Sequence, residues 1–341
     1  MAYTTIPKSS LHFTPELYVG TGSSRTISTL NFQPDWVWIK NRGTTDRHSL
    51  FDAVRAAPNM LTSNANEAQS AQPSELTAFN ANGFTVNNAT SVNGSSANYV
   101  SWNWKANGVG SANTDGSITS TVSTNTTSGF SIVKYTGTGN GGVNTVGHGL
   151  GVIPKVIIIK ALTTTQGWYQ YHESLGNTKV IDFTTAAAVT NDYWSDTTPT
   201  ASVFNVIGNT VVGGNYDYIA YCFAEKQGYS KFGSYTGNGN ADGTFTYLGF
   251  KPAFIMIKKT SGSSDWAMFD NKRQGYNVAN NLLYPNNTTS DTTGTFLDLV
   301  SNGFKMRTTA TWSNASGASY IYMAFAEAPL VSTNGNAATA R

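Results

Sequence analysis

Charged residues are scarce in this sequence, and cysteine is nearly absent. Asp, Glu, Lys and Arg make up 12% of the 341 residues, and the formal net charge is +2, whereas a typical globular domain has about 25% charged residues. Lys and Arg form no cluster, which argues against nucleic acid as a partner because phosphate binding needs grouped positive charge. Cys222 is the single cysteine, so no disulfide can form within the chain. It lies in an apolar run and is predicted to be buried.

Long hydrophobic runs are also missing. No stretch reaches the roughly 18 apolar residues of a membrane-spanning helix, and the first residues lack the apolar core of a secretion signal. We therefore expect neither membrane insertion nor signal-directed export. Ser, Thr, Asn and Gly dominate instead, next to 12% aromatic residues. This composition is typical of β-strands joined by tight turns.

Three copies of one pattern run through the chain. A Tyr-x-Gly-x-Gly motif begins each copy, at Tyr18, Tyr135 and Tyr235. Each copy closes with an aromatic strand: YVSWNWKA (99–106), YIAYCFAE (218–225) and YIYMAFAE (320–327). Between them, a Pro before an apolar run is followed by a Lys six residues later, at Pro34 and Lys40, Pro154 and Lys160, and Pro252 and Lys258. Such constant spacing indicates a duplicated structural unit.

The repeat predicts an all-β protein of three tandem β-sandwich domains of jelly-roll type. Short runs of Val, Ile and aromatic residues are bounded by Gly, Pro, Asn and Ser, and a period of about 100 to 120 residues is the size of a small domain. Residues 229–341 are therefore expected to fold alone. The predicted segments are an N-terminal arm (1–17), sandwiches at 18–108, 109–228 (with a linker or edge strand at 109–129) and 229–327, and a C-terminal tail (328–341).

Motifs of enzymatic and metal chemistry are missing. The 19 Asp and Glu residues form no alternating carboxylate pair of the kind a glycosidase needs. The four His residues lack zinc-binding spacing, and neither a nucleophile elbow nor a regular calcium loop is present. The segment 137–142 superficially resembles a phosphate loop, but its place in the repeat predicts a hairpin turn. We therefore expect no catalytic residues, no metal site and no cofactor.

Two tryptophans in polar segments are candidate glycan-binding residues. Trp194 lies in NDYWSDTT and Trp312 in TATWSNAS, outside the repeated motifs. An exposed ring can stack on the C–H face of a sugar while neighbouring amides and carboxylates bind its hydroxyls. The alternative is that each Trp covers one end of its own sandwich. The chain ends are candidate segments for docking on a neighbouring protein, with residues Tyr3, Ile6, Pro7, Leu330 and Val331.

Several segments carry a family resemblance: FQPDWVWIKNRGTTDRHSLFDAVR, GHGLGVIPKVIIIK, the opening MAYTTI and the closing YIYMAFAEAPLVSTNGNAATAR. They resemble virion proteins of tailed bacteriophages, common in marine and cyanobacterial phages, and the resemblance covers essentially the whole chain. Members are described as tail-fibre-like or structural, with concanavalin A-like sandwich domains. The resemblance implies a non-enzymatic virion protein, assembled in the host cytoplasm and released by lysis, and it supplies no catalytic residues.

Two functions fit these expectations. The first is a tail-associated, fibre-like adhesin that recognises host surface polysaccharide, and the second is a capsid decoration protein that binds other virion proteins. The absence of a coiled-coil or collagen-like shaft favours a compact component, whereas three lectin-like domains favour multivalent recognition. We expect the adhesin. A symmetric homo-oligomer is expected in either case.

Overall fold

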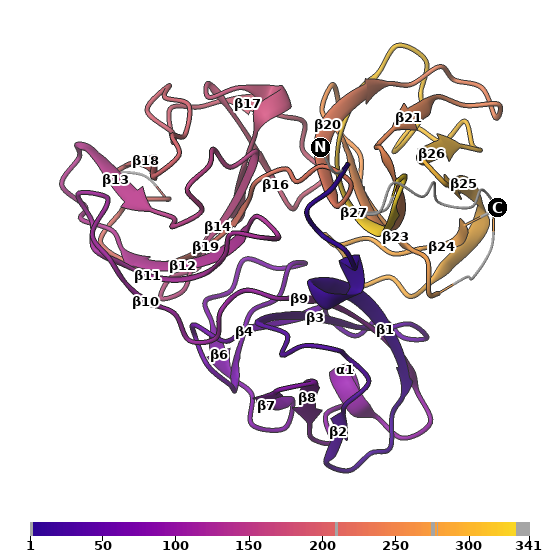
Figure 1. Cartoon of the computed structure of the whole chain (residues 1–341), viewed down its shortest axis with the longest axis horizontal. Helices are drawn as coiled ribbons and strands as arrows, with labels where there is room; N and C mark the ends of the chain where they lie inside the picture. Colours follow the sequence, from indigo (N-terminus) through magenta and orange to yellow (C-terminus); the bar gives the residue numbers. More distant parts are fainter. Residues whose placement is uncertain (1–2, 209–210, 274–276, 278, 332–341) are drawn as a thin grey trace.

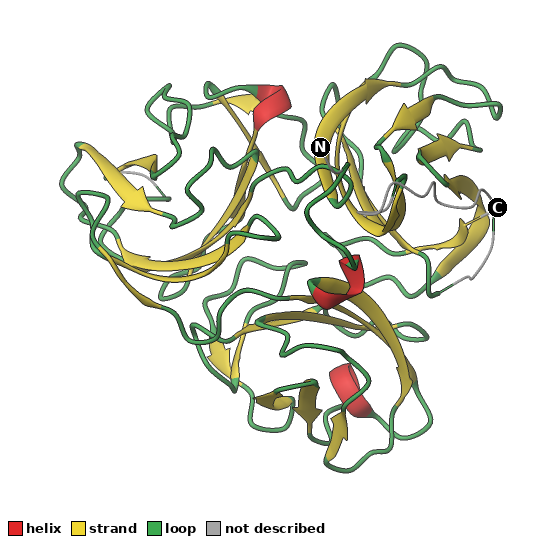
Figure 2. Ribbon diagram, viewed as in Figure 1, coloured by secondary structure: helices red, strands yellow, loops and turns green. Residues whose placement is uncertain are grey.

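The computed structural model describes residues 3–208, 211–273, 277 and 279–331. Antiparallel strands are the main regular secondary structure of this part of the chain (Figure 2). Among the described residues, helix is limited to α1 (Thr90–Asn93) and the 3-10 turns η1 (Ser9–Leu11) and η2 (Glu173–Leu175). The prediction of an all-β sandwich fold is confirmed.

Each repeat contributes an inner sheet with the same strand order. In the first repeat the order is β1 (Phe13–Val19), β9 (Asn98–Trp104), β3 (Trp36–Asn41) and β4 (Ser49–Asp52). In the second it is β12 (Phe130–Thr136), β19 (Asp217–Phe223), β14 (Val156–Ala161) and β15 (Trp168–His172). In the third it is β20 (Ser230–Thr236), β27 (Ser319–Pro329), β22 (Phe250–Lys259) and β23 (Trp266–Asp270). The closing strand of each repeat thus lies second in its sheet, and the sequence repeat is a structural repeat.

The second sheet is wider than the other two. It is extended at one edge by β10 (Ser111–Asn113) and β11 (Ser120–Asn125), and at the other by β16 (Lys179–Asp182) and β17 (Val189–Thr190). The segment 109–129 therefore supplies edge strands of the second sheet, and β11 pairs with β12 over its whole length.

A smaller outer layer covers one face of each inner sheet. It consists of β2 (Arg25–Ile27), β8 (Gly83–Val86) and β7 (Leu76–Asn80) in the first repeat, and of β13 (Val143–Gly147) and β18 (Val203–Ile207) in the second. In the third it consists of β21 (Phe245–Tyr247), β26 (Gly303–Met306), β25 (Thr292–Val300) and β24 (Ala279–Leu282). A short pair, β5 (Asn59–Met60) and β6 (Ser70–Ala71), completes the strands. Apolar side chains between the two layers form one sandwich core per repeat.

The Pro-led strands are buried on both faces. Every residue of β3 and β14 is buried, as their unbroken apolar runs predict. Because side chains alternate along a strand, Val37 and Ile39 enter the sandwich core of the first repeat, whereas Trp36 and Trp38 point the other way.

The second face of each inner sheet meets the other two repeats in one shared core. Figure 1 shows the three inner sheets arranged around a common centre, with the outer layers at the periphery. The shared core draws buried side chains from all three repeats. Its inter-repeat ring contacts include Trp36–Tyr221 (4.2 Å between centroids), Trp104–Phe254 (5.8 Å) and Phe223–Phe325 (5.7 Å). The repeats are therefore lobes of one body, and the expectation of three separately cored domains misses this central layer.

The N-terminal residues belong to this body. Residues 13–17, assigned to a free arm from the sequence, lie in β1 and pair with β9. Upstream, Ile6 is 1% exposed and packs in the shared core. Apolar burial at Ile6 and Phe13 thus fixes the start of the chain against its own lobes.

Candidate functional site

The two candidate tryptophans do not offer free ring faces. Trp194 is 2% exposed, lies in the core of the second sandwich and donates its indole N–H to the Lys179 carbonyl oxygen (3.0 Å). Its predicted exposure is wrong. Trp312 is half-buried and packs against Phe269 (5.8 Å) and Phe296 (5.5 Å). Both positions match the alternative that each Trp covers its own sandwich.

The predicted docking residues at the chain ends lie against the chain's own third repeat. The Tyr3 hydroxyl and the Leu330 N–H both donate to the Gly249 carbonyl oxygen, at 2.7 and 3.2 Å. Ile6 is in the shared core. The remaining candidates are exposed Pro7 and half-buried Val331. Positions 332–341 of the predicted tail lie outside the described residues.

Each lobe makes an equivalent hydrogen bond to a neighbouring lobe near the start of β4, β15 or β23, the fourth strand in the inner-sheet order. The indole N–H of Trp168 donates to the Thr62 carbonyl oxygen of the first repeat (2.8 Å), and that of Trp266 donates to the Asp182 carbonyl oxygen of the second (2.8 Å). In the first repeat His48 occupies this position, and its Nε2 lies 2.9 Å from the Tyr284 carbonyl oxygen of the third. The three contacts run in one direction around the centre.

Hydrogen bonding determines the protonation of His48. Its Nδ1 accepts from the Trp38 indole N–H (2.8 Å), so the ring proton must sit on Nε2 and donate to Tyr284. Burial lowers the pKa of His48 to about 3. The imidazole is therefore neutral and structural, not a proton carrier.

A second ring of contacts uses a buried acid at the end of the same strands. Asp52 pairs with Arg55 (2.5 Å) and accepts from the Tyr221 hydroxyl of the second repeat (2.8 Å). In the third repeat, Asp270 pairs with its own arginine and accepts from the Trp102 indole of the first (3.1 Å). The two donors occupy equivalent positions in the closing strands, so two of the three interfaces are built alike.

The interface between the second and third lobes is different. The closing strand of the third repeat carries Met323 at the donor position, and the second repeat carries His172 where the others have Asp. The His172 ring accepts from the Ser174 N–H (3.2 Å) and bonds the Tyr322 carbonyl oxygen through Nε2 (3.2 Å). Since Met cannot donate, a buried carboxylate here would lack its partner. At this interface both the donor position and the acceptor position thus differ from those of the other two interfaces.

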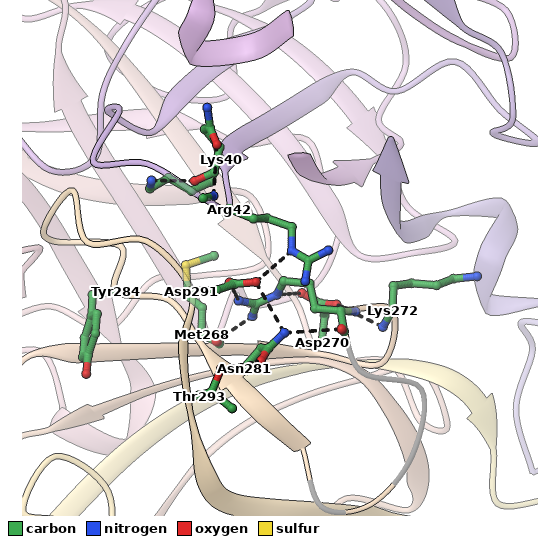
Figure 3. Close-up of polar contacts among 12 residues, drawn as sticks. Lys40, Arg42, Met268, Asp270, Lys272, Asn281, Tyr284, Asp291 and Thr293 are labelled. Atoms are coloured by element: carbon green, nitrogen blue, oxygen red, sulfur yellow. Dashed lines mark hydrogen bonds and ion pairs between the residues drawn. The ribbon is translucent and has the colours of Figure 1, made fainter. Parts of the chain in front are cut away.

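Figure 3 shows the largest of these clusters, between the first and third lobes. Arg42 reaches across to Asp291 (2.8 Å), whose second oxygen accepts from Arg273 (2.8 Å), which in turn pairs with Asp270 (2.6 Å). Burial opposes the Arg273 charge, yet the two carboxylates outweigh it and raise the pKa of Arg273. The cluster is an ion network with alternating charge that joins two lobes; Asp270 and Arg273 are fully buried, whereas the side chains of Arg42 and Asp291 are 22% and 12% exposed.

The glycine-rich loops are held by buried asparagines. The Asn93 side chain accepts from the Thr21 N–H (2.9 Å) and donates to the Ser23 carbonyl oxygen (2.6 Å), and Asn314 makes matching bonds with the 237–243 loop. In the second repeat Asn144 takes over this role. The segment 137–142 joins β12 of the inner layer to β13 of the outer layer, so the hairpin expectation is wrong: it is an arch between layers.

The single cysteine, Cys222, packs in the core of the second sandwich. Burial raises the pKa of the Cys222 thiol, which is fully buried. Within the described ranges, no group of three His, Cys, Asp or Glu side chains could hold a metal ion. No helix there is long and apolar enough to cross a membrane. The arrangement builds a rigid three-lobed body.

Sequence comparison agrees with a single three-lobed unit. A family model described as a domain of unknown function, DUF7483, matches residues 8–329. The chain belongs to this family. The match runs from just before η1 to the end of β27, so the family unit is the complete set of three lobes. Neither the curated proteins nor the solved structures contain a significant match.

Acid is expected to weaken this DUF7483 protein below pH 6.5. Burial lowers the pKa of His48 to about 3 and of His172 to about 4, from the ordinary value of 6.5. Below pH 6.5 these histidines are protonated in the unfolded chain but stay neutral in the folded chain. The free energy of unfolding therefore falls, by about 2 kcal/mol per histidine at pH 5. His48→Gln keeps one acceptor and one donor without titrating.

The measurement is the urea unfolding midpoint at pH 7 and pH 5 for wild type and variant. The variant should lose less stability between the two pH values. Equal losses would show that His48 does not contribute to the acid response.

Proposed function

We propose that this chain is a non-enzymatic surface component of a tailed-phage particle, a tail-associated adhesin that recognises host surface polysaccharide. The observation that carries the proposal is the clamping of three lobes around one core. Buried acids and histidines such as Asp52, Asp270 and His172 are engaged in inter-lobe contacts. Such a body holds several outward faces in fixed relative positions, which suits multivalent contact with a repeating polymer.

Composition and family resemblance support the same proposal. A surface rich in Ser, Thr and Asn, with 12% charged residues, presents neutral hydroxyls and amides, which are the groups that bind sugar hydroxyls. The segments that resemble tailed-phage virion proteins include both chain ends. A binding component rather than an enzyme is the function that these features favour.

Capsid decoration is the second candidate. Its support is the approximate threefold arrangement of the lobes (Figure 1), because assemblies with symmetric positions select partners of matching symmetry. Against it stands the N-terminal segment: Ile6 is buried in the chain's own core, and Tyr3 bonds Gly249. A segment that is already packed against the chain's own lobes is not free to anchor the protein to a capsid lattice, so the adhesin is preferred.

Immunogold labelling of intact particles, with an antibody raised against the purified chain, tests the proposal. Gold at the tail tip or its fibres is the expected result, together with reduced phage adsorption when cells are first incubated with the purified chain. Labelling spread over the head would replace the adhesin with the decoration function. Unlabelled intact particles would overturn both.

A further inference from the structure

Two aromatic side chains are exposed side by side on the outer layer of the third lobe. Phe245 is 46% exposed and Tyr247 is 48% exposed. They alternate with buried Thr246 on β21, so both point to the same, outer face of the strand. The strand pairs on one side only, with β26, and is an edge of its sheet. Figure 1 places β21 in the third lobe, far from the first repeat.

The other two repeats show that the fold does not need aromatic residues here. The outer strands align through a phenylalanine in their pairing partners: Phe84, Phe204 and Phe304 pair with Ile27, Val146 and Thr246. The residues flanking these three positions are Thr26 and Ser28 in the first repeat, Thr145 and Gly147 in the second, and Phe245 and Tyr247 in the third. Small or polar residues therefore suffice for the architecture, and the third lobe alone carries two rings.

Polar groups from two other elements converge on these rings. The Lys231 ammonium of β20 lies 5.3 Å from the Tyr247 ring centroid and donates to the Tyr247 carbonyl oxygen (3.2 Å). It forms no ion pair with any carboxylate of the described chain. From the N-terminal segment, the Tyr3 hydroxyl bonds Gly249 beside the Tyr247 hydroxyl. Two hydroxyls and an unpaired cation thus border the exposed rings.

The size of the patch indicates what covers it. Burying a whole aromatic side chain removes roughly 150–250 Å² from water, so two half-exposed rings offer only about 200 Å² of apolar surface. A stable protein partner needs roughly 800 Å² on each side, which excludes a second copy of the chain docked on the rings alone. One or two sugar rings match the available surface, and the Lys231 ammonium, which has no carboxylate partner among the described residues, selects a negatively charged sugar.

We infer that Phe245, Tyr247 and Lys231, with Tyr3 beside them, form a binding site for an acidic pyranose, a uronic acid unit of a surface polysaccharide. The sugar's C–H face packs on the exposed rings, and its carboxylate accepts from the Lys231 ammonium. The Tyr3 hydroxyl, whose proton is donated to Gly249, keeps its oxygen lone pairs as acceptors beside the Tyr247 hydroxyl. This inference rests on the proposed function and names its ligand class.

The decisive variant gives the third lobe the residues of the first: Phe245→Thr with Tyr247→Ser in the full chain. The probes are oligosaccharides of alginate and of polygalacturonate, with neutral dextran oligosaccharides as the comparison, and binding is measured by calorimetry. The wild type should bind a uronate probe in preference to dextran, and the double variant should bind at least about tenfold more weakly because both stacking contacts are lost. Lys231→Gln should remove the preference for the acidic probe.

A matched control places Thr26→Ala and Ser28→Ala at the equivalent positions of the first lobe, and these should leave binding unchanged. Unfolding midpoints of all variants verify that they fold. Equal binding by the wild type and the double variant would overturn the site. Absence of any uronate binding by the wild type would overturn the acidic ligand class. If either of these negative binding results is obtained while gold still labels the tail, the adhesin function is retained and only the uronate site is rejected. The two proposals can therefore be rejected independently.

Discussion

Residues 229–341 expressed alone are expected not to form a stable monomer. The third repeat places ten large apolar side chains in the shared core: Tyr229, Phe232, Phe254, Met256, Trp266, Met268, Leu283, Ile321, Met323 and Phe325. Burying each contributes about 1.5–3 kcal/mol, so removing the other lobes would forfeit roughly 15–30 kcal/mol. This exceeds the 5–15 kcal/mol or so of net stability that a folded domain has. The expectation from the repeat pattern, that this segment folds independently, is therefore reversed.

Size-exclusion chromatography with light scattering, followed by urea unfolding, measures this outcome. The segment should aggregate or assemble into a trimer that rebuilds a central core from three identical inner sheets. The full chain in the same buffer is the control and should unfold in a single transition, since all lobes share that core. A monomeric segment with a cooperative transition at micromolar concentration would contradict the shared-core account.

Asp270→Ala is expected to destabilise the full chain by about 3–5 kcal/mol, because it leaves a buried arginine without its carboxylate. Both members of the Asp270–Arg273 pair are at most 1% exposed in their side chains. The substitution also removes the acceptor of the Trp102 indole N–H, which joins the first lobe to the third. The loss of stability is therefore an interface effect as well as a local one.

Asp242→Ala serves as the matched control for Asp270→Ala. Its carboxylate pairs with Lys305 at the surface, where it is 76% exposed, and solvent-exposed pairs contribute little to stability. Urea midpoints of the two variants should differ widely. A loss below about 1 kcal/mol for Asp270→Ala would mean that water or rearrangement replaces the lost carboxylate.

Strand positions were predictable because they depend on local pattern. The apolar runs after Pro34, Pro154 and Pro252 predict strands covered on both faces, and the structure has them. What covers the second face could not be predicted: a run such as VIIIK is equally apolar whether it meets a helix, another sheet or another repeat. The shared core is a property of how the lobes meet, which no single segment encodes.

The interface residues illustrate the same limit. The sequence shows that His172 replaces an acid found in the other copies, but its partner in the third lobe, the Tyr322 carbonyl oxygen, lies 150 residues away and is not visible in the local pattern. Trp194 was misjudged because its Asn, Asp and Ser neighbours are polar, whereas its ring enters the second core and its N–H finds Lys179. The exposed pair Phe245 and Tyr247 could have been found by aligning the three outer strands and asking where one copy departs from the other two.

The three lobes are joined in one polypeptide, and this has a consequence for how such a protein can change over generations. In a trimer of identical subunits, any substitution appears at three places at once, so a new surface feature must be tolerated by every interface and every rim. A single polypeptide that contains three copies of the unit is free of that constraint, because each copy can be substituted independently of the other two. The second copy has β10 and β11 along the edge of its sheet, the interface between the second and third copies has His172 in place of an acid, and the third copy has Phe245 and Tyr247 on its outer strand. The copies can therefore differ at their edges and interfaces while they share one central core.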